Sequence, residues 1–268
     1  QPRWVDLGKE QDIYLARVDW APDGKFIYIQ WENRAQTRLI LLKADVATRK
    51  IVPLIEEDAK TWINLHDDFR ALKDGSLVWS SERSGFRHLY RWRAGKLTQL
   101  TSGDWAVKGL VGVDEAAGRL YFTGNRETPV EQHLYRVALS GGKVERLTEA
   151  GWWHEVTMNK AGTRAIVRRA SPDQPEQVFL ADATGKRLAW IEENRLDASH
   201  PYGPYLPGHA KTQFGALKAE DGTVLQTKLL LPAMEPGKRY PVFLQVYGGP
   251  GAGRQVTAGW GGALHQYL

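Results

Sequence analysis

The 268-residue sequence contains no cysteine, so it can form neither a disulfide framework nor a thiolate metal site, and it offers no cysteine nucleophile. It also contains no run of eighteen apolar residues, which is about the length a helix needs to cross a bilayer. Residues 1–4 do not start a charged region followed by an apolar stretch, as a secretory leader would. These absences are compatible with any compartment.

Patterns for three kinds of function are missing as well. No two histidines occur in a His-Glu-x-x-His frame, so we expect no zinc site and no cofactor. The net charge is +5, but Lys and Arg alternate with Asp and Glu along the chain, and no basic block is longer than Arg168-Arg169. Charge bias of this kind is a weak signal, and we expect no nucleic-acid partner. No Gly-x-Ser-x-Gly nucleophile elbow occurs anywhere in the sequence.

What is present is the composition of an ordinary folded protein and an internal repeat. Hydrophobic residues make up 42% of the chain and charged residues 25%, which allows one large core or two smaller ones. Four glycine-containing turns, each followed by a β-rich run, recur about every 45 residues. The turns lie at residues 21–25, 72–76, 114–119 and 159–163, and the runs at 26–29, 77–80, 120–123 and 164–167.

Each repeat continues in the same order. A second apolar run follows at residues 39–41, 89–90, 134–135 and 178–179, and a third short strand ends in Leu-Thr at 100–101 and 147–148. Glycine turns between alternating apolar runs predict hairpins. Four short antiparallel strands per repeat are typical of a β-propeller blade, so we predict a mostly β chain with about four blades. A β-sandwich or a series of unrelated hairpins is the alternative. Among eleven tryptophans, we expect Trp20, Trp79 and Trp92 in the core.

The repeat ends in a segment rich in proline and glycine. We predict propeller blades over residues 1–195, a linker over 196–208 and the N-terminal part of an α/β-hydrolase domain over 209–268. The last part would begin with a hairpin of two runs, 212–218 and 224–231, joined by an Asp-Gly turn. A buried strand at 242–246 would then open into Tyr-Gly-Gly-Pro-Gly at 247–251, which is how many such domains build an oxyanion hole.

Motifs in this order resemble those of a known family. They are Trp-Ala-Pro-Asp-Gly at 20–24, Ser-Glu-Arg-Ser-Gly-Phe-Arg-His-Leu-Tyr at 81–90 and Tyr-Pro-Val-Phe-Leu-Gln-Val-Tyr-Gly-Gly-Pro at 240–250. Together they resemble the prolyl oligopeptidase clan of serine peptidases, in its dipeptidyl peptidase IV branch. The resemblance implies an eight-bladed propeller that caps an α/β-hydrolase domain, with a Ser-Asp-His triad in the C-terminal third.

Several expectations follow from the resemblance. We expect the chain to be truncated at both ends and, without a nucleophile elbow, to be inactive alone. The parent is expected to act on peptide substrates, to form a homodimer and to be exported or periplasmic. Half a propeller leaves a blade face and a strand edge uncovered, so the isolated piece is expected to aggregate, dimerise or need the rest of the protein. A sharp monomeric peak in sizing chromatography would contradict this.

Tyr247 is the one catalytic residue that the resemblance assigns to this sequence. In the family, a tyrosine before a glycine-containing turn donates a hydrogen bond to the substrate carbonyl oxygen as it becomes an oxyanion. A phenol suits this role because it stays protonated at neutral pH and donates without carrying charge. The structural alternative is that Tyr247 ends a strand with its ring buried.

Two glutamate pairs resemble the family's paired glutamates, which hold the protonated amino terminus of the substrate. They are Glu56-Glu57 and Glu192-Glu193. Both pairs have polar neighbours and lie near predicted blade edges, so we interpret them as solvated charge runs. The specificity pair is expected upstream of residue 1, and no substrate-binding residue is assigned in this chain.

Three other groups receive structural interpretations. His88 and His133 each precede Leu-Tyr at equivalent positions of two repeats, which indicates a role in the fold rather than in catalysis. The pair Asp67-Asp68 is expected to carry strand-edge charges that discourage edge pairing. Trp62 could face the central cavity of the propeller, although the sequence gives no direction.

Two functions remain open from the sequence. In the first, the chain is part of a serine exopeptidase that releases X-Pro or X-Ala dipeptides through an acyl-enzyme, with the propeller restricting entry. In the second, it is a non-catalytic binding or scaffolding propeller fused to a degenerate hydrolase remnant. A nucleophile elbow downstream would distinguish them.

Overall fold

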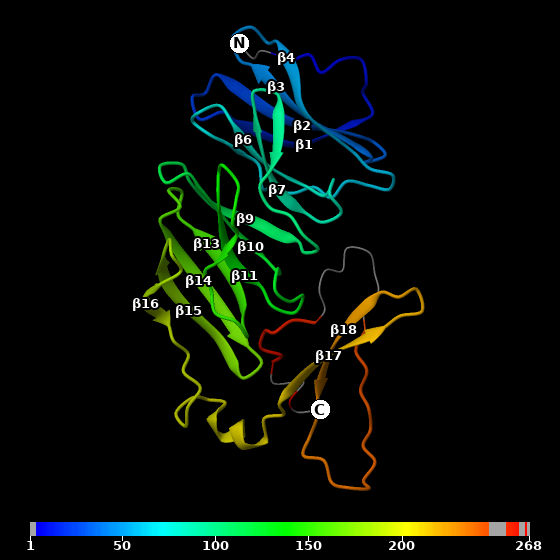
Figure 1. Cartoon of the computed structure of the whole chain (residues 1–268), viewed down its shortest axis with the longest axis vertical. Coiled ribbons are helices and arrows are strands. Elements are labelled where there is room, and N and C mark those ends of the chain that lie inside the picture. The colour runs from blue at the N-terminus through cyan, green and yellow to red at the C-terminus, as the bar shows by residue number, and fades with distance from the viewer. Residues whose placement is uncertain (1–3, 247–255, 263–265, 267–268) are drawn as a thin grey trace. The chain divides into compact units, whose positions relative to one another are not determined.

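The computed structural model describes residues 4–246, 256–262 and 266, and in these residues the chain is mostly β (Figure 1). The first two sheets contain β1 (Ile13–Trp20), β2 (Phe26–Asn33), β3 (Arg38–Asp45), β4 (Ile51–Asp58), β5 (Arg70–Ala71), β6 (Leu77–Ser81), β7 (His88–Arg93) and β8 (Lys96–Gln99). The next two contain β9 (Val107–Asp114), β10 (Arg119–Gly124), β11 (His133–Ala138), β12 (Glu145–Arg146), β13 (Trp153–Met158), β14 (Arg164–Ser171), β15 (Gln174–Asp182) and β16 (Arg187–Glu192).

Each of these four sheets consists of four strands that are consecutive in the sequence and adjacent in the sheet. The four predicted turns all join the first strand of a sheet to its second, and the glycines of these turns adopt positive φ, as at Gly24 (69°) and Gly162 (67°). Glycine enters this region without steric cost, so each turn is fixed by its sequence. The repeat of up-and-down four-stranded sheets confirms the prediction of about four propeller blades.

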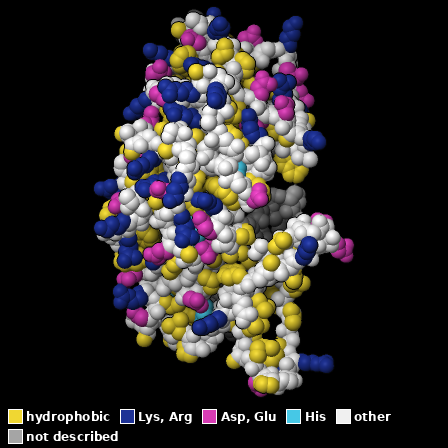
Figure 2. Space-filling model, viewed as in Figure 1, with side chains coloured by type: hydrophobic (Ala, Val, Ile, Leu, Met, Phe, Trp, Pro, Cys, Tyr) yellow, Lys and Arg dark blue, Asp and Glu magenta, His cyan; other side chains and the backbone are white. Residues whose placement is uncertain are grey.

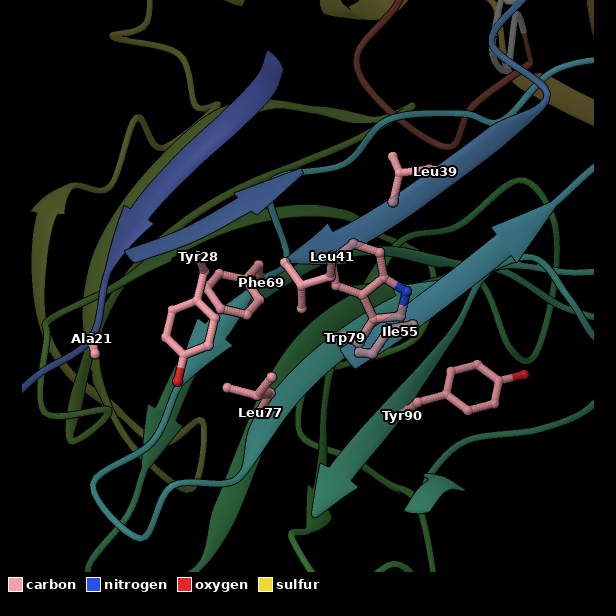
Figure 3. Close-up of a cluster of buried hydrophobic side chains, with 9 residues drawn as sticks. All are labelled: Ala21, Tyr28, Leu39, Leu41, Ile55, Phe69, Leu77, Trp79 and Tyr90. Carbon is pink, nitrogen blue, oxygen red and sulfur yellow. The ribbon is translucent and has the colours of Figure 1, made fainter. Parts of the chain in front are cut away.

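The chain divides into two compact units, residues 1–120 with 137–144 and residues 121–136 with 145–268. In the first unit, the core lies between the first two sheets (Figure 3). Residues directly opposite one another in a sheet share a face, and Leu41 faces Gln30 on one side and Ile55 on the other. This face packs against residues of the second sheet, among them Leu77 and Trp79.

The three tryptophans expected in the core behave differently. Trp79 is buried as predicted, and Trp92 is partly buried against the same core. The prediction for Trp20 is wrong, because its side chain is 62% exposed. Trp20 ends β1, an edge strand that has a single neighbour, β2, so the sheet covers one side of it only.

The second unit has its own small core in the sheet of β13 to β16. Its buried members and the side chains packed against them are Ala165, Val167, Phe179, Ala181, Val156, Met158 and Trp190. After this sheet, a short 3-10 helix (Gly203–Gly208) lies within the predicted linker, and β17 (Thr212–Lys218) and β18 (Val224–Leu230) form the predicted hairpin. The predicted domain boundaries at 195 and 208 stay a prediction.

The strand predicted at residues 242–246 is wrong for this structure. These residues form no strand, and the apolar side chains of Val242, Phe243, Leu244 and Val246 are exposed. A buried strand needs neighbouring strands to pair its backbone and a layer to cover its side chains, and no strand pairs with this segment in the described residues. Its apolar sequence is thus not sufficient to form the strand here.

A repeated histidine–threonine contact ties the third strand of a sheet to the segment after its fourth. The Nδ1 atoms of His88 and His133 each lie 3.1 Å from a threonine Oγ1, of Thr101 and Thr148 respectively. The same hydroxyls accept the backbone N–H groups of Leu89 and Leu134. Both histidines are fully buried, so the predicted structural role is confirmed.

Buried histidines make the stability of this protein depend on pH. His154 is 1% exposed and lies 3.0 Å through Nδ1 from the Gln132 carbonyl oxygen, and burial lowers its pKa from 6.5 to about 3. Below pH 6.5 the His154 ring therefore binds a proton in the unfolded chain but not in the folded chain. Stability is lost as the pH falls toward 3. We expect this one residue to remove about 1.6 kcal/mol of unfolding free energy between pH 6.5 and 5.

Urea unfolding at a series of pH values tests this prediction. His154→Gln keeps an N–H donor for the Gln132 carbonyl group but has no titrating ring, so the slope between pH 6.5 and 5 should become shallower. Equal slopes in the two proteins would show that His154 titrates normally in the folded chain.

Side chains of both charge signs are interleaved on the face shown in Figure 2, as the sequence indicated. Within the residues described above, no helix is long and apolar enough to cross a membrane.

Candidate functional site

The candidate site is a cavity of about 100 Å³ in the first unit, at the polar end of its core. It lies beside the first two sheets and the segment that connects β4 to β5. Figure 3 shows the indole nitrogen of Trp79 directed away from Tyr28 and Phe69. The lining side chains come from β2, β3, β4 and β6 and the segments that follow β4 and β6: Gln30, Leu39, Glu57, Asp58, Ala59, Trp62, Ile63, Asn64, Leu65, His66, Trp79, Ser80, Ser81, Glu82, Arg83 and Arg87.

Glu57 anchors one wall of the cavity. Its Oε1 accepts hydrogen bonds from Trp79 Nε1 (2.8 Å) and Arg83 Nη2 (2.6 Å), and its Oε2 accepts one from Ser81 Oγ (2.8 Å). The side chain is only 11% exposed. The interpretation of Glu57 as a solvated charge is therefore wrong. Tertiary packing places it against Trp79 of the next sheet, whereas its neighbour Glu56 stays half exposed and pairs with Arg38.

Aromatic and polar side chains form the rest of the wall. The His66 ring meets the Trp79 ring edge-on at 4.7 Å between centroids, and burial lowers the pKa of His66. Trp62 is half exposed and donates from Nε1 to Asn64 Oδ1 (3.1 Å). Asn64 in turn donates from Nδ2 to Glu82 Oε2 (2.8 Å), so these rim residues hold one another in place.

Two residues of the cavity, Gln30 and Ser80, were not predicted as site residues from the sequence. They are 2% and 1% exposed, and Gln30 Oε1 and Ser80 Oγ have no hydrogen-bond partner in the described residues. One signal was available: Gln30 directly follows the apolar run Phe26–Ile29. A polar residue inside a buried strand is more informative than an apolar one.

The Glu57 carboxylate is expected to stabilise the first unit. Glu57→Gln replaces one acceptor oxygen with an NH2 group, which then faces a hydrogen-bond donor. The variant also removes the charge that pairs with Arg83. We therefore expect a loss of about 2 kcal/mol in the free energy of unfolding. Glu56→Gln is the matched control, because its partly exposed ion pair should contribute below about 1 kcal/mol. Urea unfolding measures both, and equal losses would contradict the role assigned to Glu57.

The other acidic residues singled out in the sequence have separate positions. Glu192 is exposed and Glu193 pairs with Arg195, which confirms that this pair is a surface charge run. Asp67 is exposed and pairs with Arg17 at 2.6 Å, as a strand-edge charge would. The prediction for Asp68 is wrong. The Asp68 side chain is buried, and its Oδ1 accepts the backbone N–H of Leu110 (2.7 Å).

The predicted oxyanion donor, Tyr247, lies outside the described residues, so its assignment rests on the sequence. The structure brings none of the other singled-out acidic residues or histidines to the Glu57 cavity. Its walls combine a hydrogen-bonded carboxylate, aromatic rings and unfilled acceptors, which is the chemistry of a binding site for a small group with N–H donors.

Comparison with known proteins identifies the family. Residues 1–176 match the family described as "Dipeptidyl peptidase IV (DPP IV) N-terminal region". Among curated relatives, human "Dipeptidyl peptidase 8" is 30% identical over 88% of this chain and 33% of its own length. "Probable dipeptidyl peptidase 4" of Aspergillus flavus is 26% identical over 96% of this chain and 34% of its own length. The chain thus spans about a third of the length of these relatives.

Solved structures of similar fold have related names. "Dipeptidyl peptidase 4" of Porphyromonas gingivalis superposes with a TM-score of 0.87 at 20% identity, over 98% of this chain and 38% of that one. A "putative dipeptidyl aminopeptidase IV" from Bacteroides ovatus gives a TM-score of 0.79 at 28% identity, over 96% and 39%. The first shows the fold alone, and the match of residues 1–176 covers most of the chain. Four consecutive propeller blades and that match lead to one conclusion: the chain belongs to the dipeptidyl peptidase IV N-terminal region family.

Proposed function

We propose that this chain is the propeller-to-hydrolase segment of a serine exopeptidase that releases X-Pro or X-Ala dipeptides from the amino termini of peptides. The observation that carries the proposal is the order of parts in one chain. Four blade sheets are followed by the β17–β18 hairpin and then by the Tyr-Gly-Gly-Pro-Gly motif at 247–251. The names of the relatives, all dipeptidyl peptidases, support the same activity.

The chemistry is acyl transfer. A serine attacks the carbonyl carbon of the second residue, a histidine takes the serine proton and gives it to the leaving amine, and an aspartate orients the histidine. Water then hydrolyses the acyl-enzyme, which releases the dipeptide and restores the serine. The triad lies outside this chain. The contribution of this chain is the Tyr247 hydroxyl, which donates to the oxyanion of the tetrahedral intermediate. The blades restrict entry to small peptides.

The direct test is an assay of the full-length protein. Gly-Pro-p-nitroanilide and Ala-Ala-p-nitroanilide should be cleaved, and their N-acetylated forms should not, because an exopeptidase of this kind needs a free amino terminus. A fluorophosphonate should label one serine and abolish the activity. A protein that retains peptides but neither cleaves them nor takes the label would instead be a non-catalytic scaffold.

Gating by the propeller has its own readout. Cleavage of a folded protein with a free X-Pro amino terminus should be far slower than cleavage of a short peptide with the same sequence. Equal rates would contradict restricted entry while leaving the peptidase activity intact.

A further inference from the structure

The cavity beside Glu57 contains buried acceptors that no donor in the described residues fills. Gln30 Oε1 comes from β2 of the first sheet and Ser80 Oγ from β6 of the second, and both side chains are almost completely buried. A buried acceptor without a partner destabilises a protein by about 1 to 3 kcal/mol. Two such acceptors line one cavity from opposite sheets, which indicates that the cavity binds a group with hydrogen-bond donors.

The size of the cavity limits what this can be. At about 100 Å³ it holds a few water molecules, or the end of one alkyl side chain with its polar head group. Leu39, Ile63 and Leu65 supply apolar lining for an alkyl stem, and Trp62 and Trp79 supply aromatic rings for a cation. A mixed lining of this kind favours an amphipathic group over water alone.

The charged groups of the walls do not oppose a cation. Three carboxylates line the cavity, those of Glu57, Asp58 and Glu82, against two guanidinium groups, those of Arg83 and Arg87. Each carboxylate pairs with an arginine, Glu57 with Arg83 (2.6 Å), Glu82 with Arg87 (3.7 Å) and Asp58 with Arg38 (4.0 Å), so the lining has no excess of positive charge.

The carboxylate of Glu32 lies on β2, the strand next to β3. Glu32 is buried and stands directly opposite Leu39 on β3, and Leu39 stands opposite Glu57 on β4, so the three share one face of the sheet. Burial raises the pKa of Glu32, with the Gln36 side chain opposing the shift. A cation bound beside Leu39 would interact favourably with the ionised form of Glu32.

From these observations we propose that the cavity is a binding site for a primary ammonium group on a short alkyl chain, such as the end of a lysine side chain. Gln30 Oε1 and Ser80 Oγ accept two of its three N–H donors. The rings of Trp62 and Trp79 face its charge, and the apolar lining covers its stem. The proposal does not rest on the proposed peptidase activity.

Saturation-transfer difference NMR on the full-length protein tests the site with n-butylammonium as probe. Two further ligands separate the contributions: n-butanol has the stem without the charge, and tetramethylammonium has the charge without N–H donors. We expect saturable transfer to n-butylammonium and at least about tenfold weaker binding of the other two, the factor expected when one hydrogen bond to a charged group is lost.

Two variants connect the binding to the unfilled acceptors. Gln30→Met and Ser80→Ala should each weaken n-butylammonium binding about tenfold, and the thermal midpoint of the ligand-free protein should stay the same or rise, because each removes an unpaired buried polar atom. Ser76→Ala is the control. Ser76 is equally buried and close in the sequence, but its hydroxyl is paired with Asp74 and Arg91 outside the cavity.

Three results would overturn the proposal. The first is the absence of saturable n-butylammonium binding, which would leave water as the occupant of the cavity. The second is tetramethylammonium binding as tightly as n-butylammonium, which would reduce the effect to general attraction of cations. The third is unchanged binding in both Gln30→Met and Ser80→Ala.

Discussion

Tyr247→Phe is expected to lower kcat of the full-length enzyme by about 10² to 10³, because it removes one hydrogen-bond donor to the developing oxyanion. This corresponds to about 3 to 4 kcal/mol of transition-state stabilisation. The donor acts mainly in the transition state, so kcat and kcat/KM should fall together while KM changes little. Steady-state kinetics with Gly-Pro-p-nitroanilide measures both parameters.

Tyr205→Phe is a suitable control for this variant. Tyr205 lies in the 3-10 helix of the linker with an exposed side chain, so the loss of its hydroxyl should leave both kinetic parameters unchanged. If Tyr247→Phe retained the wild-type kcat, Tyr247 would have no part in catalysis, and the oxyanion donor would have to be sought elsewhere.

Gly185→Ala is expected to destabilise the second unit by about 4 kcal/mol. Gly185 lies in the turn between β15 and β16 with φ +85°, and a Cβ built on it would lie 2.3 Å from the Leu147 carbonyl oxygen. Left-handed backbone alone costs an L-residue about 1 to 2 kcal/mol. The remainder arises because the contact is with backbone, which cannot move aside as the end of a flexible side chain can.

Gly24→Ala separates these two costs. Gly24 has a similar φ of +69°, but its Cβ would have nothing within 4 Å. We expect a loss of about 1 kcal/mol for this variant, which is the conformational cost alone. Urea unfolding of both variants gives the difference, and equal losses would show that the turn relaxes away from Leu147 at no cost.

The fold was largely predictable because its signals are local. The turn glycines and the alternation of apolar residues each act within a few residues and recur in every repeat, and two of the repeats also end in Leu-Thr. The structural role of His88 and His133 was predictable too, because both precede Leu-Tyr at equivalent positions of two repeats, whereas their partners Thr101 and Thr148 were found only in the structure.

The wrong predictions all depend on contacts between elements. Glu57 looks like a surface charge beside Glu56, and Asp68 looks like one beside Asp67. In each pair, one residue faces solvent and the other is buried against a neighbouring sheet or strand. Trp20 differs from Trp79 for the same reason, since one lies on an edge strand and the other inside the core.

The sequence by itself therefore determined the four-stranded repeats, their turns, the hairpin after the linker and the family, because short-range conformational preferences and motif order specify them. Only the tertiary structure decided which polar side chains are buried together. The cavity formed by Gln30, Glu57 and Ser80 joins residues from three strands of two sheets, and no local pattern encodes their meeting. The physical reason is that burial and pairing of a polar group depend on what packs against it, and in this chain those partners lie about 20 to 50 residues away in the sequence.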